Sequence, residues 1–316
     1  MALLHPVLHD VEYVENSVSK SRRSSLRLAC YNIERGQRLN TIIDLWIRHR
    51  ARLSDIILLS EADRGMARSG NRHTAQEFGE ALGYSWAYAV EFIELTKGNR
   101  RERRVSGDNQ AGHIGNAILS RFPLSNLQVV RLPCFFDYSQ RFMARIGSRI
   151  AVIADVRIDG YLLTVVSVHL ESDSSPKQRS IQIEALLAAI RVRDGGQPII
   201  IGGDMNTTGL DVNRLIRSVL RRPWIVVKSP SISVLETIEP MFALLRHEGF
   251  GYRQCNLDSY TLRTRGYKAH LDWFFAKNVE PNKLRNPEIY RAFEDCSRFS
   301  DHQPVAIDFA LDNVSS

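Results

Sequence analysis

The chain has 316 residues, of which 44% are hydrophobic, and it carries a formal net charge of +7. This hydrophobic content is ordinary for a globular protein, and no apolar stretch is long enough to span a bilayer, so the composition excludes a helical membrane protein. The basic balance favours an anionic partner such as a nucleic acid, an inositol phosphate or a lipid headgroup.

The cysteines are widely separated, with no Cys-x-x-Cys pair, which predicts buried thiols rather than a disulfide framework and leaves only an isolated bridge open. They are Cys30, Cys134, Cys255 and Cys296. Residues 1–6 are too briefly apolar for a secretory signal, and the segment soon becomes acidic, so a cytoplasmic location is expected.

Residues 1–25 are polar and end in a basic, serine-rich segment, which predicts a flexible N-terminal arm. A strand is expected at residues 26–32. A helix is expected at residues 39–50, because the apolar residues there form one broad face. The next elements expected are a strand at 56–60 that leads into Glu61, a helix at 74–82 and a strand at 84–91.

Residues 95–113 are polar, basic and rich in Gly and Asn, which predicts a long mobile loop. Its basic run, residues 97–104, is either a solvated face or a surface that follows a phosphate backbone, and the second interpretation assigns Arg103 and Arg104 to substrate binding. Further basic residues lie at 214–222 and at Arg263, Arg265 and Lys268.

The rest of the chain mixes strands and helices without strict βαβ alternation, which favours two packed sheets and an α+β fold. A helix is expected to begin at Ser175-Pro176 and to stop near Gly195, because its apolar residues recur at helical spacing. Broken helical pieces are expected at 211–251. Strands are expected at 115–120, 125–131, 148–157, 162–168 and 198–201, around Asp272, and at 305–309.

Polar side chains repeatedly stand where an apolar strand ends. Asp204 and Asn206 follow one such strand two residues apart, so in extended chain both side chains face one ligand. Ordinary turn chemistry at a strand exit is the alternative. If these strands share sheets, one edge gathers donors that suit a hard divalent cation and a phosphate. The set is Asn32, Glu61, His169, Asp204, Asn206, Asp272, Asp301 and His302.

These segments, in this order, resemble the endonuclease/exonuclease/phosphatase superfamily, which includes DNase I. The motifs are Tyr31-Asn32-Ile33, Ser60-Glu61, Gly115-Asn116-Ala117, Val168-His169-Leu170, Gly203-Asp204-Met205-Asn206, Leu271-Asp272-Trp273 and Ser300-Asp301-His302. The resemblance implies a four-layer α/β/β/α sandwich of two mixed sheets, with residues 26–312 as a single catalytic domain. It also implies a Mg²⁺-dependent phosphodiesterase or phosphatase site at the sheet edges.

The resemblance implies that Glu61 is the principal Mg²⁺ ligand, with Mn²⁺ as a substitute cation, and that Asn32 and Asp301 belong to the same metal site. Mg²⁺ is commonly held by one or two carboxylates together with substrate phosphate. Asp204 would orient or deprotonate the attacking water. Asn206 would hold that water or a phosphoryl oxygen.

His302 and Asp272 resemble the family's His–Asp pair, in which the carboxylate sets the tautomer of the imidazole and raises its pKa. His169 would donate to the phosphate as charge accumulates in the transition state. Asn116 is expected to contact a phosphate oxygen, and Glu91 could brace His169.

The continuation His169-Leu170-Glu171-Ser172 is similar to type 2 tyrosyl-DNA phosphodiesterases and to bacterial relatives, whereas apurinic-site endonucleases carry Tyr at the position of His169. A nucleic acid, DNA first, is therefore the expected substrate of a monomeric enzyme. The alternative is a phospholipid or inositol phosphate, with the aromatic segment 134–138 as a lipid-contacting loop or, in the plainer interpretation, as core. A non-catalytic binding protein on the same fold is the alternative of another class.

Overall fold

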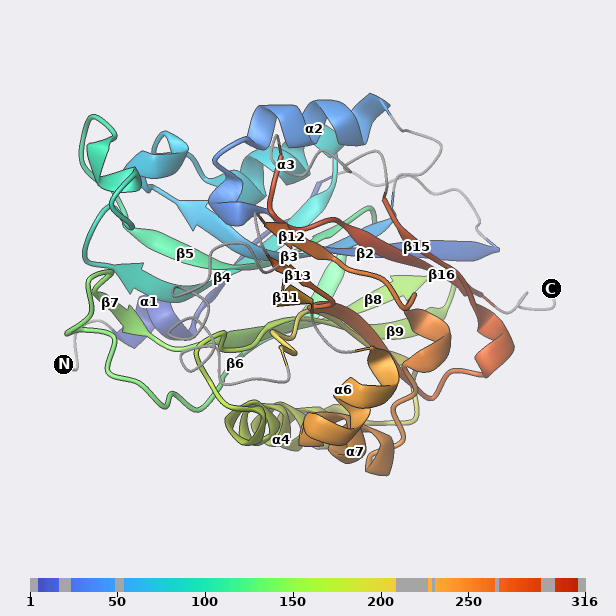
Figure 1. Cartoon of the computed structure of the whole chain (residues 1–316). Coiled ribbons are helices and arrows are strands. Elements are labelled where there is room, and N and C mark those ends of the chain that lie inside the picture. Colours follow the sequence, from blue (N-terminus) through green and yellow to red (C-terminus); the bar gives the residue numbers. More distant parts are fainter. Residues whose placement is uncertain are drawn as a thin grey trace.

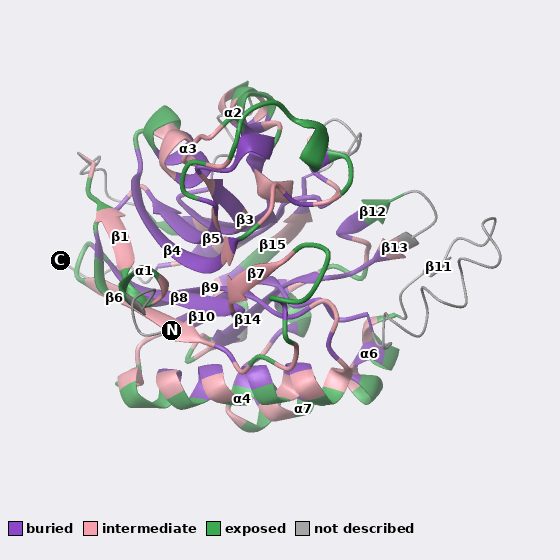
Figure 2. Cartoon of the chain, turned by 90° about the vertical axis from the view of Figure 1, so that its left-hand side faces the viewer, coloured by how far each residue is buried: buried purple, intermediate pink, exposed green. Residues whose placement is uncertain are grey.

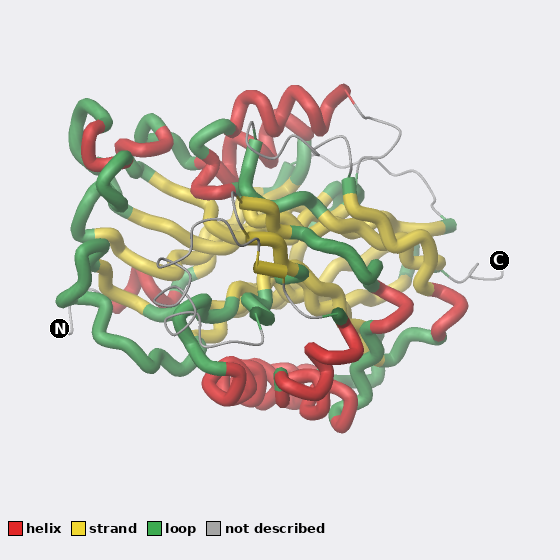
Figure 3. Tube along the Cα trace, in the orientation of Figure 1, coloured by secondary structure: helices red, strands yellow, loops and turns green. Residues whose placement is uncertain are grey.

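Two β-sheets pack face to face at the centre of the molecule, and helices cover both outer faces (Figure 1, Figure 3). The computed structural model describes residues 5–16, 24–48, 54–208, 227–228, 231–264, 267–290 and 299–311. The predicted α+β fold, a four-layer α/β/β/α sandwich, is confirmed. The covering helices are α2 (Leu39–Arg48) and α3 (Thr74–Leu82) on one side, and α4 (Pro176–Arg193), α6 (Ile232–Ile238) and α7 (Pro240–His247) on the other.

The larger sheet is antiparallel except where β2 and β3 run parallel. Its path is β1 (Val11–Val14), β4 (Ser85–Glu94), β5 (His113–Ser120), β3 (Ile56–Arg64), β2 (Ser25–Asn32), β16 (Val305–Ala310) and β15 (Leu284–Ile289), and β7 (Arg145–Gly147) pairs with β4 off this path. Because β2 and β3 are parallel neighbours, their carboxyl ends, which carry Asn32 and Glu61, lie at the same edge of the sheet.

The smaller sheet has the order β14 (Asp272–Lys277), β10 (Ile199–Asp204), β9 (Tyr161–His169), β8 (Ile150–Ile158) and β6 (Leu124–Arg131). Parallel β9 and β10 place His169 beside Asp204, and antiparallel β14 places Asp272 on the other side of Asp204. A separate small sheet contains β11 (Val227–Lys228), β13 (Tyr267–Ala269) and β12 (Leu262–Thr264).

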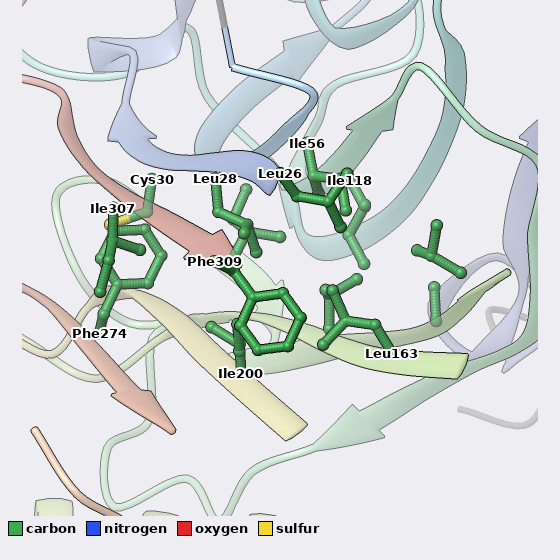
Figure 4. Close-up of a cluster of buried hydrophobic side chains, with 14 of the residues drawn as sticks. Leu26, Leu28, Cys30, Ile56, Ile118, Leu163, Ile200, Phe274, Ile307 and Phe309 are labelled. Atoms are coloured by element: carbon green, nitrogen blue, oxygen red, sulfur yellow. The ribbon is translucent and has the colours of Figure 1, made fainter. Parts of the chain in front are cut away.

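The interior between the sheets is apolar because strand side chains alternate between faces. Figure 4 shows Cys30 and Ile307 of the larger sheet in one cluster with Ile200 and Phe274 of the smaller sheet, and all four are almost fully buried. A second apolar layer joins α4 and α7 to the outer face of the smaller sheet. The close-packed sandwich therefore holds the strand ends, and the polar residues on them, in a defined register.

The expected N-terminal arm is wrong for residues 5–16. Helix α1 (His5–His9) and β1 precede the first expected strand, and β1 pairs with β4 through all four of its residues. Val11 and Tyr13 pack against the core between the sheets, and the Arg131 guanidinium donates to the Leu8 carbonyl. Because Val11 and Tyr13 alternate with polar or exposed residues, β1 can bury one face and serve as an edge strand of the larger sheet.

The loop at 95–112 is anchored, which contradicts the expectation of a mobile segment. Glu102 is 3% exposed, accepts hydrogen bonds from the backbone of Asn99 and from Arg35, and lies 3.8 Å from Arg68. Ion pairs buried in this way hold a loop in place because their separation would leave an uncompensated charge.

Other expectations differ in detail. Strand β3 runs past Glu61 to Arg64, and β15, β7 and the pair β12–β13 were not expected. Cys30 and Cys255 are buried, whereas Cys134 is exposed. Cys296, Arg265, residues 214–222 and most of the expected helical stretch before residue 227 lie outside the described residues. Among the helices that the structure describes, none is both long enough and apolar enough to cross a membrane.

Two glycines allow the chain to approach its neighbours at the end of β10. A Cβ on Gly202 would lie 2.7 Å from the Phe274 ring, and one on Gly203 (φ +147°) would lie 1.9 Å from the Val168 carbonyl oxygen. We expect Gly203→Ala to lower the free energy of unfolding by roughly 3 kcal/mol, because alanine is strained at this φ and its Cβ must push β9 away. Urea denaturation measures this change.

The matched control is Gly195→Ala, whose new Cβ meets only the side chain of Gln197, at 3.2 Å. This variant should unfold at nearly the wild-type urea concentration. Equal midpoints for Gly203→Ala and the wild type would contradict the close approach of β9 to β10.

His270 stacks on Trp273, with 3.9 Å between ring centroids, and burial lowers the pKa of His270 to about 4. Because the unfolded chain binds a proton near pH 6.5 and the folded chain near pH 4, stability falls as the pH is lowered between these values. Between pH 7 and 4.5 this single group should cost about 2–3 kcal/mol. Urea denaturation of the wild type and of His270→Phe at both pH values tests this prediction. The variant keeps a stacked ring but cannot bind the proton, so it should lose less stability over this pH interval. An equal loss of stability in both proteins would contradict the prediction.

Candidate active site

Polar side chains from both sheets meet around Asp204 at the end of β10. Asn32, from the end of β2, donates its amide nitrogen to Asp204 Oδ2 over 3.1 Å. His169 Nε2 and His302 Nε2 each lie 3.6 Å from the same oxygen. Asp204 is 2% exposed, and its pKa is raised by burial, against the opposing effect of both histidines. The carboxylate is therefore a stronger base than an ordinary aspartate.

The backbone of Asn206 holds the second oxygen of Asp204. Its N–H donates to Asp204 Oδ1 over 3.0 Å, and its side-chain amide donates to the Leu170 carbonyl over 2.9 Å. Asn206 has a left-handed backbone with φ 49°, which ends the strand and permits both contacts. The expected extended chain is therefore wrong at Asn206, and the two residues form a turn, as the alternative interpretation of the strand exit had it.

Glu61 occupies a β-bulge between Leu59 and Ala62, with φ 54°. Strained left-handed residues are uncommon in strands and concentrate at functional sites. Burial would raise the pKa of Glu61, but Arg35 foremost, then His169 and Arg149, hold it at about 2. Glu61 is therefore ionised at neutral pH, with the Arg35 Nε 3.8 Å away.

Two further carboxyls, Glu34 and Asp301, stand close enough to Glu61 to repel it. Burial first, and then this mutual repulsion, raises the pKa of both Glu34 and Asp301. Asn32 links this group to Asp204, because its Oδ1 accepts from the backbone N–H of Glu34 over 3.0 Å. Several carboxylates beside an amide oxygen are the donor chemistry that Mg²⁺ prefers, so these residues fit such an ion.

His302 is held between two carboxylates. Its Nδ1 lies 2.7 Å from Asp272 Oδ2, which gives the His–Asp pair its geometry. Burial would lower the pKa of His302, but Asp272 and Asp204 outweigh it and raise this pKa well above its ordinary value. Ligating atoms of Asp204, Asp272 and His302 lie within 4.8 Å of one another, so this group could also hold a cation. With a proton on both nitrogens, however, the imidazolium is a charged donor and not a ligand.

His169 lies in a second buried group that contains an arginine. Its Nδ1 is 3.4 Å from Oε2 of Glu91, the acid expected to brace it, and 2.8 Å from Arg149 Nη1. Arg149 also pairs with Glu91 and, at 3.4 Å, with Glu171. The two glutamates raise the pKa of Arg149 further against its burial, so the guanidinium stays charged beside the imidazole. Sequence reasoning missed Arg149 and Glu34, since neither belongs to a pattern.

Three expected substrate contacts have different surroundings. Asn116 donates to the Ile150 carbonyl over 3.0 Å, and its buried Oδ1 has no hydrogen-bond partner among the described residues. The Arg103 guanidinium lies 3.8 Å over the Phe142 ring, and Arg104 is exposed. Neither arginine lines the cavity of about 810 Å³ that opens beside Glu61. Arg100 and Arg101, from the same loop, do line it.

A sandwich of two sheets, with carboxylates, amides and two imidazoles converging at one edge, is suited to the hydrolysis of phosphoester bonds. A family model described as Endonuclease/Exonuclease/phosphatase family matches residues 29–302. The chain belongs to this family, and it is therefore an enzyme that hydrolyses phosphoester bonds. Members of the family generally depend on a divalent metal.

Solved structures share the fold at low sequence identity. An endonuclease/exonuclease/phosphatase from Beutenbergia cavernae DSM 12333 is 19% identical, with a TM-score of 0.58 over 92% of this chain and 72% of that one. An AP endonuclease from Archaeoglobus fulgidus is 16% identical, with a TM-score of 0.57 over 90% of this chain and 100% of that one. A humanized D. rerio TDP2 is 16% identical, with a TM-score of 0.53 over 92% and 100%. The comparison with curated proteins gave no match.

Proposed function

We propose that this enzyme is a Mg²⁺-dependent phosphodiesterase that uses activated water and acts on nucleic acid, DNA first. The observation that carries the proposal is the convergence of Asn32, His169 and His302 on one oxygen of Asp204. A positioned base of raised pKa beside polar donors is suited to activating water for in-line attack on a phosphate. TDP2 and AP endonuclease neighbours share this fold, and the basic charge of the chain agrees with a polyanionic substrate.

Glu61, Asp301 and Asn32 would hold Mg²⁺, or Mn²⁺ in its place, and Glu34 stands beside them. When bound, the ion neutralises charge on the phosphate and lowers the pKa of bound water. The residues fit this ion because they offer hard oxygen ligands whose negative charges otherwise repel each other.

The remaining groups divide the proton transfers and the charge stabilisation. Asp204, with its raised pKa, accepts a proton from the attacking water, and Asn206 fixes the orientation of that carboxylate. The imidazolium of His302 donates to a phosphoryl oxygen or to the leaving group, with Asp272 stabilising its charge. His169, braced by Glu91 and Arg149, donates to a second phosphoryl oxygen. We assign these roles to one catalytic domain of residues 26–312, to which β1 (Val11–Val14) adds an edge strand. The larger sheet takes strands from both ends of this span, and the smaller sheet takes its strands from between them.

The test is hydrolysis of plasmid DNA, single-stranded DNA and a phospholipid panel with Mg²⁺ or Mn²⁺, each repeated with EDTA and with Asp204→Ala. The proposal expects metal-dependent DNA cleavage that the substitution removes. Turnover of phospholipid alone would assign the enzyme to lipid substrates, and DNA cleavage that persists in EDTA would contradict the metal requirement.

A further inference from the structure

The cavity beside Glu61 is an arginine-rich chamber built by segments far apart in the sequence. Loop residues 99–101 form one side, and residues 138–145, which lead into β7, form another. These segments are joined by the pairing of β7 with β4, by a 2.8 Å hydrogen bond from Leu95 N to Ala144 O, and by a hydrogen bond from Arg103 to Phe142 O. Strand β7 lies on the side of the molecule that faces the viewer in Figure 2. The chamber is thus a formed part of the fold.

The chamber has a large excess of positive charge. Six arginines line it, against the two acids Glu61 and Asp173. The arginines are Arg35, Arg100, Arg101, Arg141, Arg145 and Arg149. Asp173 is already paired with Arg141, and Arg35 faces Glu61.

Three of these arginines lie beyond ion-pair distance of any described carboxylate. Arg100, Arg101 and Arg145 form no ion pair with any residue that the structure describes. Arg145 contributes, after Arg149, to lowering the pKa of Glu91 and Glu171, but both glutamates pair with Arg149 rather than with Arg145. Glu94 lies 3.8 Å from Arg68. The buried Nε of Arg145 also has no hydrogen-bond partner among the described residues. Guanidinium groups left in this state suit phosphate oxygens.

Aromatic rings accompany the charge. Phe142 and Tyr138 line the chamber, and Phe142 is 53% exposed. The Arg103 guanidinium already covers one face of the Phe142 ring at 3.8 Å. The Arg145 guanidinium lies 4.2 Å from the centroid of Tyr138. Alternating cations and rings are the means by which proteins bind a nucleic-acid strand whose bases are unpaired.

We propose that this chamber binds the part of a single-stranded nucleic acid next to the scissile phosphate, with phosphates on the arginines and a base against Phe142. The proposal rests on the proposed function, because Glu61 forms one wall and places the scissile phosphate at that end. The cavity, of about 810 Å³, has the size of a ligand pocket, and the exposed Phe142 ring can stack only on a base that is not already stacked within a duplex. A lipid headgroup would use the arginines but offers no planar group to the ring.

The test measures binding to the full-length protein in EDTA, so that it does not depend on hydrolysis. Fluorescence anisotropy follows a labelled oligothymidylate, its duplex with oligoadenylate, and competition by inorganic tripolyphosphate or by anionic phospholipid vesicles. The single strand should bind at least tenfold more tightly than the duplex. Phe142→Ala should weaken single-strand binding about tenfold and leave competition by tripolyphosphate unchanged, because only a base stacks on the ring.

The paired variant Arg100→Ala/Arg101→Ala should reduce the salt dependence of single-strand affinity. If both arginines contact phosphates, the slope of log K against log salt should fall in magnitude by about 1.4, since each phosphate contact to a single strand contributes about 0.7. The matched control is Arg157→Ala/Arg246→Ala, which removes the same charge from two exposed positions that do not line the chamber. Its slope should stay near that of the wild type.

Several results would overturn the proposal. One is equal affinity for the duplex and the single strand. Another is an equal loss, in both double variants, of the slope of log K against log salt. A third is that Phe142→Ala abolishes binding to phospholipid vesicles while the oligothymidylate still binds. Hydrolysis of bis(p-nitrophenyl) phosphate by the wild type with Mg²⁺ tests the proposed chemistry separately. Strand binding in EDTA without this hydrolysis would reject the catalytic proposal and retain the binding site, and hydrolysis without selective strand binding would do the reverse.

Discussion

Replacing Asp204 with asparagine is expected to lower kcat by roughly two to four orders of magnitude, the usual contribution of a positioned general base. Asparagine keeps the shape of the side chain and an oxygen for the Asn206 N–H, but it cannot take a proton from water. Because substrate binding uses other groups, KM should change little. A loss in kcat and in kcat/KM of equal size marks a group that acts in the transition state.

The control for this experiment is Asp159→Asn. Asp159 is exposed in the turn between β8 and β9, at the opposite end of β9 from His169. Both variants should unfold within a few degrees of the wild type in thermal scans followed by circular dichroism. If Asp204→Asn retained more than a tenth of wild-type activity, the assignment of Asp204 as the base would be wrong.

The sequence predicted those parts of the fold that local periodicity determines. The helix expected at 74–82 has these bounds, and the helix expected from Ser175-Pro176 begins there because Ser175 and Gln178 form a capping box. Long-range pairing was harder to foresee. Strand β15 (Leu284–Ile289) contains Asn, Pro and Glu, and it becomes a strand because it lies at the edge beside β16. Tertiary contacts there override weak local preference.

At the site, strand-end residues could be foreseen and loop residues could not. Asn32, His169, Asp204 and Asp272 each end or begin an apolar strand, so their meeting follows once the strands pair. Arg149 stands alone before β8, and its place beside His169 depends on how β8 packs against β9. In the basic loop, Arg100 and Arg101 line the cavity, whereas Arg103 and Arg104 do not. This difference depends on a single 3-10 turn, Glu102–Arg104, which no periodic sequence pattern predicts.

Backbone strain is present in the candidate active site. Glu34 (φ 46°), Arg35 (φ 67°), Glu61 (φ 54°) and Asn206 (φ 49°) all have left-handed backbones. Such residues cost of order 1–3 kcal/mol each and persist where the surrounding structure holds them. Arg35 connects the carboxylates around Glu61 to the loop at 95–112, because it faces Glu61 and pairs with Glu102 of that loop at 2.8 Å. One guanidinium therefore contacts both the loop at 95–112 and the carboxylate of Glu61.

Replacing Asp272 with asparagine is expected to lower kcat at neutral pH about a hundredfold and to move the alkaline limb of the pH profile to lower pH. The direction follows from the His–Asp pair: Asp272 is the nearer of the two carboxylates that raise the pKa of His302. Without that charge, the burial of His302 is opposed only by Asp204 and Asp301, so the pKa of His302 falls. Because His302 donates as the imidazolium, activity should then be lost at a lower pH than in the wild type.

The measurement is kcat/KM between pH 6 and 10 for the wild type, Asp272→Asn and His302→Ala. His302→Ala should lose roughly two to four orders of magnitude at every pH, since no charged donor remains to titrate. Asp272→Asn should approach wild-type activity most closely at the acidic end, where His302 is still protonated. An unshifted alkaline limb in Asp272→Asn would mean that the limb reports another group. In that case the pair would hold the imidazole in position without setting its charge.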